Sequence, residues 1–450
     1  MQLSNDFIQS TRQLFGSERF ERFMHALDEE SPVSVRLNPK KMPAYDGSVG
    51  EPVPWCRDAY YLSSRPNFTF DPLMHAGCYY VQEASSMFLD EVLRQYLPLT
   101  GDKGLQTTDK GLQTADCRGK TTDKGLQTTD YRLKSEGGRA LSCLDMCAAP
   151  GGKSTLLRSA LPEGSVLYSN EPVPKRASIL LENVEKWGYD NHFVTNLYPK
   201  DYRKSKMRFD LILCDVPCSG EGMFRKDPNA ANEWSLRNVE HCWQLQREIV
   251  ADAWQCLNMG GLLVYSTCTY NTKENEENVR WIVEELGAEV LSVDTKPEWG
   301  ITGSLLEGWN EPVYRFIPGY TRGEGLFMAV LRKTGGDDSH GTAKRVPVRE
   351  CHGVTADAEK VEVDYSQAIA YLRGESIVLP ADAPRGIVNI CFMGHVLGQA
   401  KNIGNRANNL YPKEWRIKST HVPQEYDGLN IAPTTFFPPQ LRSSNSQLEI

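Results

Sequence analysis

The chain contains the stretch Leu144-Asp145-Met146-Cys147-Ala148-Ala149-Pro150-Gly151-Gly152-Lys153-Ser154, which joins the strand-like run 141–147 to a helical pattern at 152–160. Small residues and glycines allow the backbone of such a loop to approach a ligand closely, and the start of the following helix offers free N–H donors. The stretch is therefore typical of the ligand-binding turn at the carboxyl end of the first strand in an open α/β sheet.

Two other kinds of ligand loop fit this stretch less well. Gly152-Lys153-Ser154 matches the end of a phosphate-binding loop, but that loop requires glycine at the position of Cys147. A dinucleotide site would show Gly-x-Gly-x-x-Gly, which this loop does not. An acid about 20 residues past the glycine loop commonly accepts hydrogen bonds from ribose hydroxyls, and Glu171 has that spacing. With Asn196 closing the next strand, where it could read an adenine edge, the pattern favours an adenosyl ligand.

From Leu141 onward, strand-like and helical patterns alternate along the chain. The expected strands are 141–147, 165–170, 192–196, 209–215, 261–267, 288–293 and 325–332. The expected helices are 152–160, 174–187, 236–258 and 273–286. Such alternation predicts a mostly parallel sheet with helices on both faces.

The 450 residues divide into segments of different character. We expect a small N-terminal α/β domain at 1–98, an insertion at 99–136, a larger α/β domain at 137–334, a linker at 335–358 and a β-rich domain at 359–450. The insertion repeats Asp-Lys-Gly-Leu-Gln-Thr from Asp102, Asp109 and Asp123. Each repeat has a single leucine, so the segment forms no coiled-coil seam, and we expect it to be disordered.

Composition restricts the class of protein. The first residues lack a basic and apolar leader, and no apolar run approaches the roughly 20 residues of a membrane span, so we expect a cytoplasmic protein away from membranes. The twelve cysteines then point to reduced thiols rather than disulfides. A net charge of −8 argues against a general nucleic-acid binder, although basic clusters at 200–208 and 401–418 leave RNA open as a partner.

Two cysteines follow strand-like runs at positions that would face the same crevice. Cys218 lies in Asp215-Val216-Pro217-Cys218-Ser219-Gly220, and Cys268 lies in Tyr265-Ser266-Thr267-Cys268-Thr269. A thiolate is a strong nucleophile, and a second thiol beside it could carry a proton, which suits chemistry on an electron-poor carbon. Cys143-x₃-Cys147 and Cys214-x₃-Cys218 have spacings that could suggest zinc, but no histidine pair accompanies them, so we expect no metal.

Several motifs together resemble one family. The loop ending in Lys153, the segment Asp215-Val216-Pro217-Cys218-Ser219-Gly220-Glu221-Gly222-Met223-Phe224-Arg225-Lys226 and Ser266-Thr267-Cys268 are similar to those of Sun-type RNA cytosine-5 methyltransferases. Ser34-Val35-Arg36-Leu37-Asn38 and Tyr79-Tyr80-Val81-Gln82-Glu83-Ala84-Ser85-Ser86-Met87 resemble the N-terminal part of the RsmF-type subgroup, which modifies small-subunit ribosomal RNA. Lys401 to Arg416 is similar to the PUA-like RNA-binding tail of that subgroup. The resemblance covers nearly the whole chain outside the insertion.

The resemblance implies an RNA-binding-like N-terminal domain at 1–98 and a catalytic, Rossmann-like methyltransferase domain at 137–334 that uses S-adenosylmethionine. It implies that Cys147 to Lys153 hold the methionine end of the cofactor, Glu171 the ribose and Asn196 the adenine. Asp215 would lie at both the cofactor and the base. DNA cytosine-5 methyltransferases attack with the cysteine of a Pro-Cys pair, which would nominate Cys218, whereas the Thr-Cys pair marks the RNA class. We therefore expect Cys268 to attack and Cys218 to assist release.

The chain departs from the family pattern at Asn196, where aspartate is usual, and at Gly319, where histidine is common. The amide oxygen of Asn196 can still accept the adenine amino group.

The expected product is 5-methylcytosine in ribosomal RNA, made by a monomer. Transfer RNA is the alternative substrate, and a catalytically silent RNA-binding ribosome-assembly factor is the alternative from another functional class.

Overall fold

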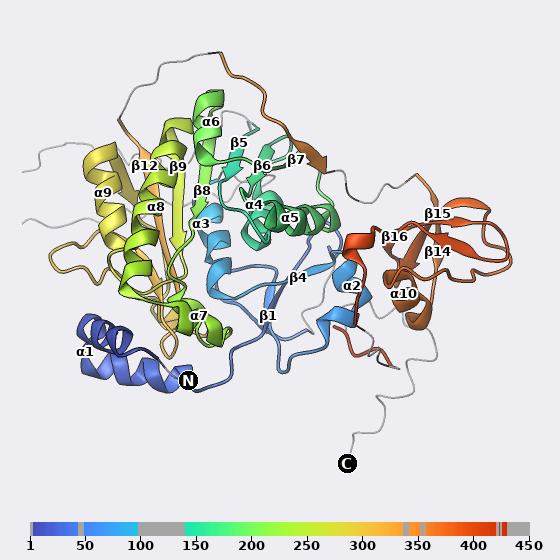
Figure 1. Ribbon diagram of the computed structural model, residues 1–450, viewed down its shortest axis with the longest axis horizontal. Coiled ribbons are helices and arrows are strands. Elements are labelled where there is room, and N and C mark those ends of the chain that lie inside the picture. The colour runs from blue at the N-terminus through green and yellow to red at the C-terminus, as the bar shows by residue number, and fades with distance from the viewer. Residues whose placement is uncertain are drawn as a thin grey trace, which may run out of the picture.

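A computed structural model describes residues 3–43, 49–97, 140–335, 342–351, 353, 357–419, 423 and 425–429 of the chain. Figure 1 shows a large central sheet flanked by helices, with a small N-terminal sheet beneath it and a separate C-terminal domain at one side. The insertion expected at 99–136 lies outside the described residues.

The central sheet has the order β10-β12-β9-β8-β5-β6-β7-β13, and β11 pairs with β12. The run from β7 to β9 is parallel, whereas β12 is antiparallel to its neighbours and β13 is antiparallel to β7. The strands are β5 (Ser142–Asp145), β6 (Val166–Asn170), β7 (His192–Thr195), β8 (Phe209–Asp215), β9 (Leu257–Thr267), β10 (Ala288–Leu291), β11 (Tyr314–Phe316), β12 (Leu326–Lys333) and β13 (Arg349–Cys351). The mostly parallel sheet predicted from the sequence is therefore confirmed.

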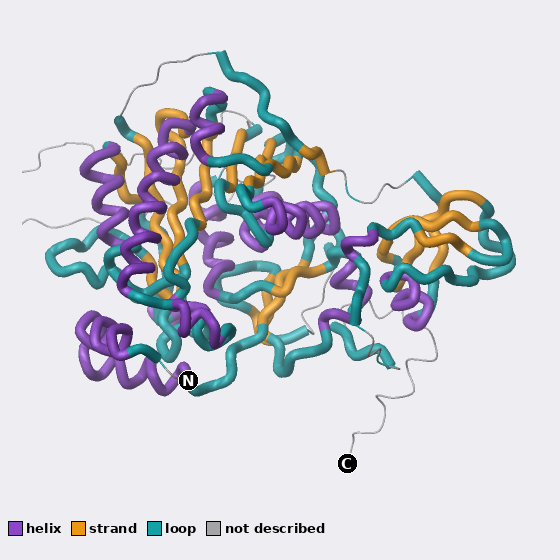
Figure 2. The backbone as a smooth tube through the Cα atoms, viewed as in Figure 1, coloured by secondary structure: helices purple, strands orange, loops and turns teal. Residues whose placement is uncertain are grey.

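Helices cover both faces of this sheet (Figure 2). They are α3 (Leu89–Tyr96), α4 (Gly152–Ala160), α5 (Pro174–Trp187), α6 (Pro199–Ser205), α7 (Pro228–Glu233), α8 (Leu236–Cys256) and α9 (Glu276–Leu286). The bounds of α5 follow from its sequence, since Pro174 occupies the first turn and Gly188 ends the helix with a φ of 77°. One apolar core joins α3 and α4 to the sheet, and another joins α6, α8 and α9 to the opposite face.

The N-terminal region is built onto the catalytic domain rather than standing apart from it. Its antiparallel sheet has the order β2-β3-β1-β4, formed by β2 (Glu51–Pro52), β3 (Ala59–Tyr61), β1 (Ser34–Leu37) and β4 (Tyr79–Val81). Helix α1 (Asn5–Leu27), interrupted at Gly16, packs Phe7 and Phe23 against Phe224 and Tyr270 of the catalytic domain. Because α3 also belongs to the core of the large sheet, this region and the catalytic domain share their packing.

The C-terminal domain forms a second small sheet with the order β14-β15-β16-β17. Its elements are β14 (Glu359–Glu362), α10 (Tyr365–Leu372), β15 (Gly386–Phe392), β16 (His395–Asn402) and β17 (Ala407–Asn409). Its core continues into the N-terminal region, where the short helix α2 (Pro72–His75) contacts α10 and β16. The buried carboxylate of Asp71 accepts hydrogen bonds from the Tyr79 hydroxyl at 2.6 Å and from the Leu429 amide at 2.9 Å.

The segment that we expected to be a linker contributes to the catalytic sheet. Arg349 to Cys351 form β13, which pairs with β7 at the edge of the central sheet. Strand pairing of this kind depends on residues more than 150 positions apart, which local composition does not report. In the part of the chain that the structure describes, no helix has the length and apolar character needed to cross a bilayer.

Candidate active site

Cys218 and Cys268 lie side by side at the carboxyl ends of β8 and β9. Their Sγ atoms are 3.1 Å apart, and the Cys268 amide donates a hydrogen bond to the Cys218 Sγ at 3.3 Å. The neighbouring parallel strands place Asp215 opposite Ser266, so the loops that follow them leave the sheet together. The structure thus brings the two predicted cysteines together.

The two loops that carry the cysteines approach each other so closely at Gly222 that no side chain fits there. The Gly222 amide donates to the Cys268 carbonyl at 2.8 Å. A Cβ atom at Gly222 would lie 2.9 Å from that carbonyl oxygen and 2.7 Å from the Gly325 oxygen. Glycine at 222 is therefore required for the close approach of the loops.

A cavity of about 540 Å³ lies above these strand ends, and Cys268 and Asp215 line it. The cavity also takes in most of the glycine loop, namely Cys147, Ala148, Ala149, Pro150, Gly152 and Lys153. Residues of the N-terminal region, including Tyr80, Gln82 and Glu83, complete its wall. One cavity therefore joins the expected nucleophile to the expected cofactor loop.

Lys153 and Asp215 form an ion pair inside this cavity. The Lys153 Nζ donates to the Asp215 Oδ2 at 2.9 Å, and the Ser266 hydroxyl donates to the other carboxylate oxygen at 2.6 Å. Burial works against the charge of Lys153, but the Asp215 carboxylate and the nearby Cys268 thiol hold the pKa of Lys153 above its usual value. Lys153 therefore remains a cation beside Cys268.

Asp145 is a site residue that the sequence analysis missed. Its side chain is fully buried and lines the cavity, where Oδ2 accepts a hydrogen bond from the Ser154 hydroxyl while Oδ1 has no partner. Burial raises the pKa of this carboxyl to about 7. A buried carboxylate oxygen without a donor is costly, so this atom fits a ligand that carries N–H groups. Its position at the end of the first predicted strand was the available signal.

Glu171 and Asn196 lie together at the ends of β6 and β7. The Glu171 carboxylate is buried, accepts the Val173 amide at 2.9 Å and pairs with Arg176 at 3.3 Å. The Asn196 Nδ2 donates to the Glu171 carbonyl at 2.6 Å, so its Oδ1 atom is the one left to meet a ligand. Gly151, the residue that precedes α4, has a φ of 119°, in the left-handed region that favours glycine.

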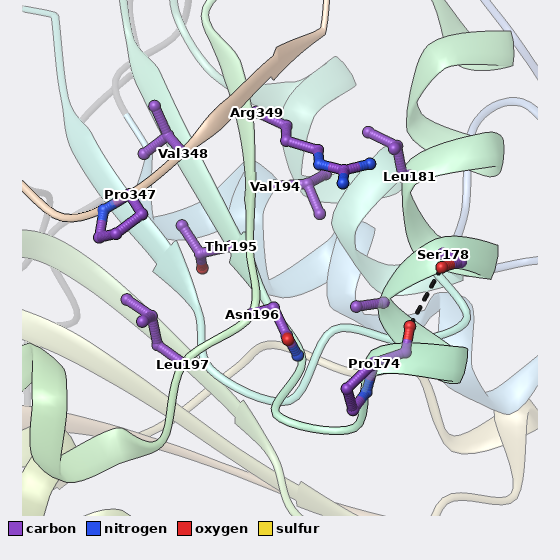
Figure 3. Close-up of a pocket in the computed structure, with 11 residues that line it drawn as sticks. Pro174, Ser178, Leu181, Val194, Thr195, Asn196, Leu197, Pro347, Val348 and Arg349 are labelled. Carbon is purple, nitrogen blue, oxygen red and sulfur yellow. Dashed lines mark hydrogen bonds between the residues drawn. The ribbon is translucent and has the colours of Figure 1, made fainter.

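A second cavity, of about 420 Å³, lies between α5, β7 and the segment leading into β13 (Figure 3). Asn196 lines this cavity together with Pro174, Thr195 and Arg349. The lining includes neither cysteine and none of the glycine loop. Asn196, which is bonded to the Glu171 carbonyl, therefore lines this second cavity rather than the one that Cys268 lines.

An arginine of the N-terminal sheet holds the cofactor loop in place. The Arg36 guanidinium is buried and donates to the Gly152 carbonyl at 3.1 Å, to the Thr155 hydroxyl at 2.6 Å and to Gln82 Oε1 at 2.9 Å. Burial lowers the pKa of this guanidinium. Residue types alone could not reveal this role, because Arg36 and Gly152 are 116 positions apart.

Among the described residues, no cluster of three or more histidine, cysteine, aspartate or glutamate side chains has a geometry suited to a metal ion. Cys143 and Cys214 are fully buried in the sheet, where burial raises the pKa of both thiols. They pack as small apolar residues.

Comparison with known proteins matches three family descriptions to successive parts of the chain. Residues 133–332 match "16S rRNA methyltransferase RsmB/F", residues 3–84 match "N-terminal domain of 16S rRNA methyltransferase RsmF", and residues 358–417 match "Methyltransferase RsmF PUA domain". The predicted architecture, a Rossmann-like methyltransferase domain between a small N-terminal domain and a PUA-like domain, is confirmed.

The chain is similar to ribosomal RNA small subunit methyltransferase F of Cronobacter sakazakii, with 30% identity over 414 residues that cover 85% of this chain and 77% of that protein. It is 28% identical to the protein of the same name from Pectobacterium atrosepticum, covering 74% of this chain and less than two thirds of that relative, namely 63%. The structure of NSun6 from Pyrococcus horikoshii with SFG has the same fold, with a TM-score of 0.55, 18% identity, and coverage of 74% of this chain and 99% of that one.

Proposed function

Because the chain belongs to the 16S rRNA methyltransferase RsmB/F family, we propose that it transfers a methyl group from S-adenosylmethionine to carbon 5 of a cytosine in small-subunit ribosomal RNA. The observation that carries this proposal is the pair of thiols 3.1 Å apart beside the cofactor loop. We place the reaction in the cytoplasm. Bisulfite sequencing of ribosomal and transfer RNA from a strain without the gene tests this proposal. We expect the loss of one protected cytosine in 16S RNA. A loss confined to transfer RNA would show that transfer RNA is the substrate instead.

Carbon 5 of cytosine is a weak nucleophile, so the protein must activate it. In the proposed reaction the Cys268 thiolate bonds to carbon 6, and the pair of electrons released from the ring double bond makes carbon 5 nucleophilic. Asp215 faces the same cavity and would hold the pyrimidine ring. After carbon 5 gains its methyl group, Cys218, which by then has passed its own proton to water, takes up the carbon 5 proton as a thiolate. The bond between carbon 6 and sulfur then breaks to release Cys268 as a thiolate.

The surroundings of the two thiols support this division of roles. The Lys153 cation lies near Cys268, where it would face the sulfur that attacks in the proposed reaction. Cys218 instead accepts a hydrogen bond, and the hydrogen bond with Cys268 together with burial raises the pKa of Cys218 well above its usual value. A thiolate at Cys268 beside a protonated Cys218 is the arrangement required for attack by Cys268.

The residues of the loop fit S-adenosylmethionine, which when bound supplies a methyl group on a sulfonium. The partnerless Asp145 Oδ1 would accept the amino group of the methionine end, and Glu171 and Asn196 would hold the adenosine end. The solved relative with the shared fold was determined with SFG, an analogue of this cofactor.

We expect Glu171→Ala to weaken S-adenosylmethionine binding by roughly 1.5–3 kcal/mol, the range for a hydrogen bond to a charged group. Titration calorimetry measures the change. Glu163→Ala is the matched control, because Glu163 is an exposed acid on the turn between α4 and β6. Equal affinity for S-adenosylmethionine in both variants would show that Glu171 does not contact the cofactor.

The PUA-like domain is the proposed contact with the RNA backbone. Lys401 and Arg406 are exposed around β16. We expect the double variant Lys401→Ala/Arg406→Ala to bind RNA more weakly and to lower the slope of log affinity against log salt by about 0.7–0.9 for each lost phosphate contact. Filter binding at several salt concentrations measures the slope, and Lys296→Ala, an exposed lysine of the catalytic domain, serves as the control. An unchanged slope would place RNA binding elsewhere.

These substitutions are a sharper test than removal of the whole C-terminal domain. That domain shares an apolar core with the N-terminal region, and residues 425–429 contact the buried Asp71. Truncation would expose this core, so a loss of RNA binding would not report on the basic surface alone.

A further inference from the structure

Two buried carboxylates lie beneath the cysteine loops and take no part in the reaction described above. Glu221 and Glu274 are 2% and 0% exposed, and the Asn271 Nδ2 bridges them with hydrogen bonds of 3.0 and 2.8 Å. Within the described part of the chain, no salt bridge joins either carboxylate to a cation. Two negative charges are therefore held next to the thiols by neutral donors alone.

Glu274 is the carboxylate that reaches the backbone at Cys218. Its Oε2 accepts the Ser219 amide at 3.0 Å and the Gln246 Nε2 at 2.7 Å. The same Gln246 nitrogen donates to the Pro217 carbonyl at 2.8 Å. The peptide groups on both sides of Cys218 are thus tied to one carboxylate, directly or through one glutamine.

The hydrogen bonds around Glu274 also indicate its charge state. The N–H groups of Ser219, Gln246 and Asn271 donate to its carboxylate, and hydrogen bonds of this kind favour the ionised form. Burial and the Glu221 charge raise the pKa of Glu274. The titratable groups that face Glu274 are Glu221 across Asn271, Cys218 and Cys268 on the two loops, Cys242 on α8 and Tyr265 on β9.

Building on the proposed function, we propose that Glu274 is a positioning residue that fixes Cys218 against Cys268 and, through its negative charge, keeps Cys218 in the thiol form. A charge on one side of the pair and Lys153 on the other would make the two neighbouring thiols unequal. Cys268 would then be the thiolate that attacks, and Cys218 would be held in reach of carbon 5 for the elimination step.

Two variants separate the positioning role from the charge. Glu274→Asp keeps the charge but is too short to keep the Ser219 bond, whereas Glu274→Gln removes the charge and keeps the length. Glu284→Gln, an exposed acid on α9, is the matched control, and the melting temperature of each variant reports on folding. Cys218→Ala is the reference for a stalled elimination.

The first measurement is the RNA–protein adduct on a denaturing gel. Glu274→Asp, which displaces Cys218, should accumulate at least about tenfold more adduct than the control, because attack proceeds while elimination slows. Glu274→Gln keeps the position of Cys218 and should accumulate no more adduct than the control. A general loosening of the site would lower methyl transfer without adduct. If Cys218→Ala traps adduct and Glu274→Asp does not, the positioning role is wrong. If Cys218→Ala also traps none, the covalent mechanism itself is wrong.

The second measurement needs no RNA, so it decides the charge role even if the mechanism fails. Iodoacetamide alkylation of Cys218 is followed by mass spectrometry at pH 8. In Glu274→Gln its rate should rise by about tenfold, the effect of lowering the pKa of a mostly protonated thiol by one unit. In Glu274→Asp the rate should stay close to that of the control. An equal rate in Glu274→Gln and the control would overturn the charge role.

Discussion

Cys268→Ala is expected to abolish methyl transfer and to form no covalent complex with RNA, whereas Cys218→Ala should attack and methylate but stall before release. The expectation follows from the proposed chemistry. Without the Cys268 thiol no bond to carbon 6 forms. Without Cys218, whose Sγ lies 3.1 Å from that of Cys268, no thiol is in place to remove the proton from carbon 5. An RNA–protein adduct that survives denaturing electrophoresis should therefore accumulate in Cys218→Ala only.

The reverse pattern, with adduct in Cys268→Ala and none in Cys218→Ala, would assign attack to Cys218, as in the DNA cytosine-5 methyltransferases. The double variant should form no adduct. Cys242→Ala is the control, since Cys242 is a buried cysteine of α8 with no place in the proposed reaction. Any RNA that the protein accepts can serve as the probe.

Local patterns in the sequence located the elements that carry the site. The expected helices 152–160 and 174–187 coincide with α4 and α5, and the expected strand 209–215 coincides with β8. These segments are long and strongly periodic, and their ends carry glycine or proline. Because the carboxyl ends of parallel neighbours meet, the strand assignments alone predicted that Cys218 and Cys268 would be close.

What the sequence could not show depends on contacts between distant segments. Arg36 reaches the cofactor loop across 116 positions, and Leu429 reaches Asp71 across 358. A single sequence carries no pairing information at such separations, so it could not show that side chains of the N-terminal segment line the catalytic cavity. Its proposed boundary at residue 98 divides the sequence, but not the core, because α3 packs under the large sheet.

Buried polar residues form the second group that sequence patterns did not identify. Glu274 follows the Thr-Cys pair in a polar run at the start of the expected helix 273–286, a composition typical of an exposed helix end. The structure instead buries it under the cysteines. Glu276, two residues later, is likewise buried, and it pairs with Arg315 of β11.

That second pair leads to the largest expected effect on stability. Glu276 begins α9 and is fully buried, and Arg315 of β11 donates from Nε to its Oε1 at 2.6 Å and from Nη2 to its Oε2. Arg315 also donates to the Tyr270 carbonyl at 2.6 Å, two residues after Cys268. The pair therefore joins α9, β11 and the loop that carries the attacking cysteine.

Glu276→Ala should lower the free energy of unfolding by about 3–5 kcal/mol, because it leaves the Arg315 charge buried without a partner. Urea denaturation of this variant beside Glu284→Ala, an exposed position on the same helix expected to change stability by no more than about 0.5 kcal/mol, measures the difference. The double variant Glu276→Leu/Arg315→Met should recover most of the loss, since removing both charges removes the desolvation cost as well. A single variant as stable as the Glu284 control would mean that water reaches Arg315. Recovery of stability without recovery of methyl transfer in the double variant would show that the bond from Arg315 to the Tyr270 carbonyl holds Cys268 in its reactive position.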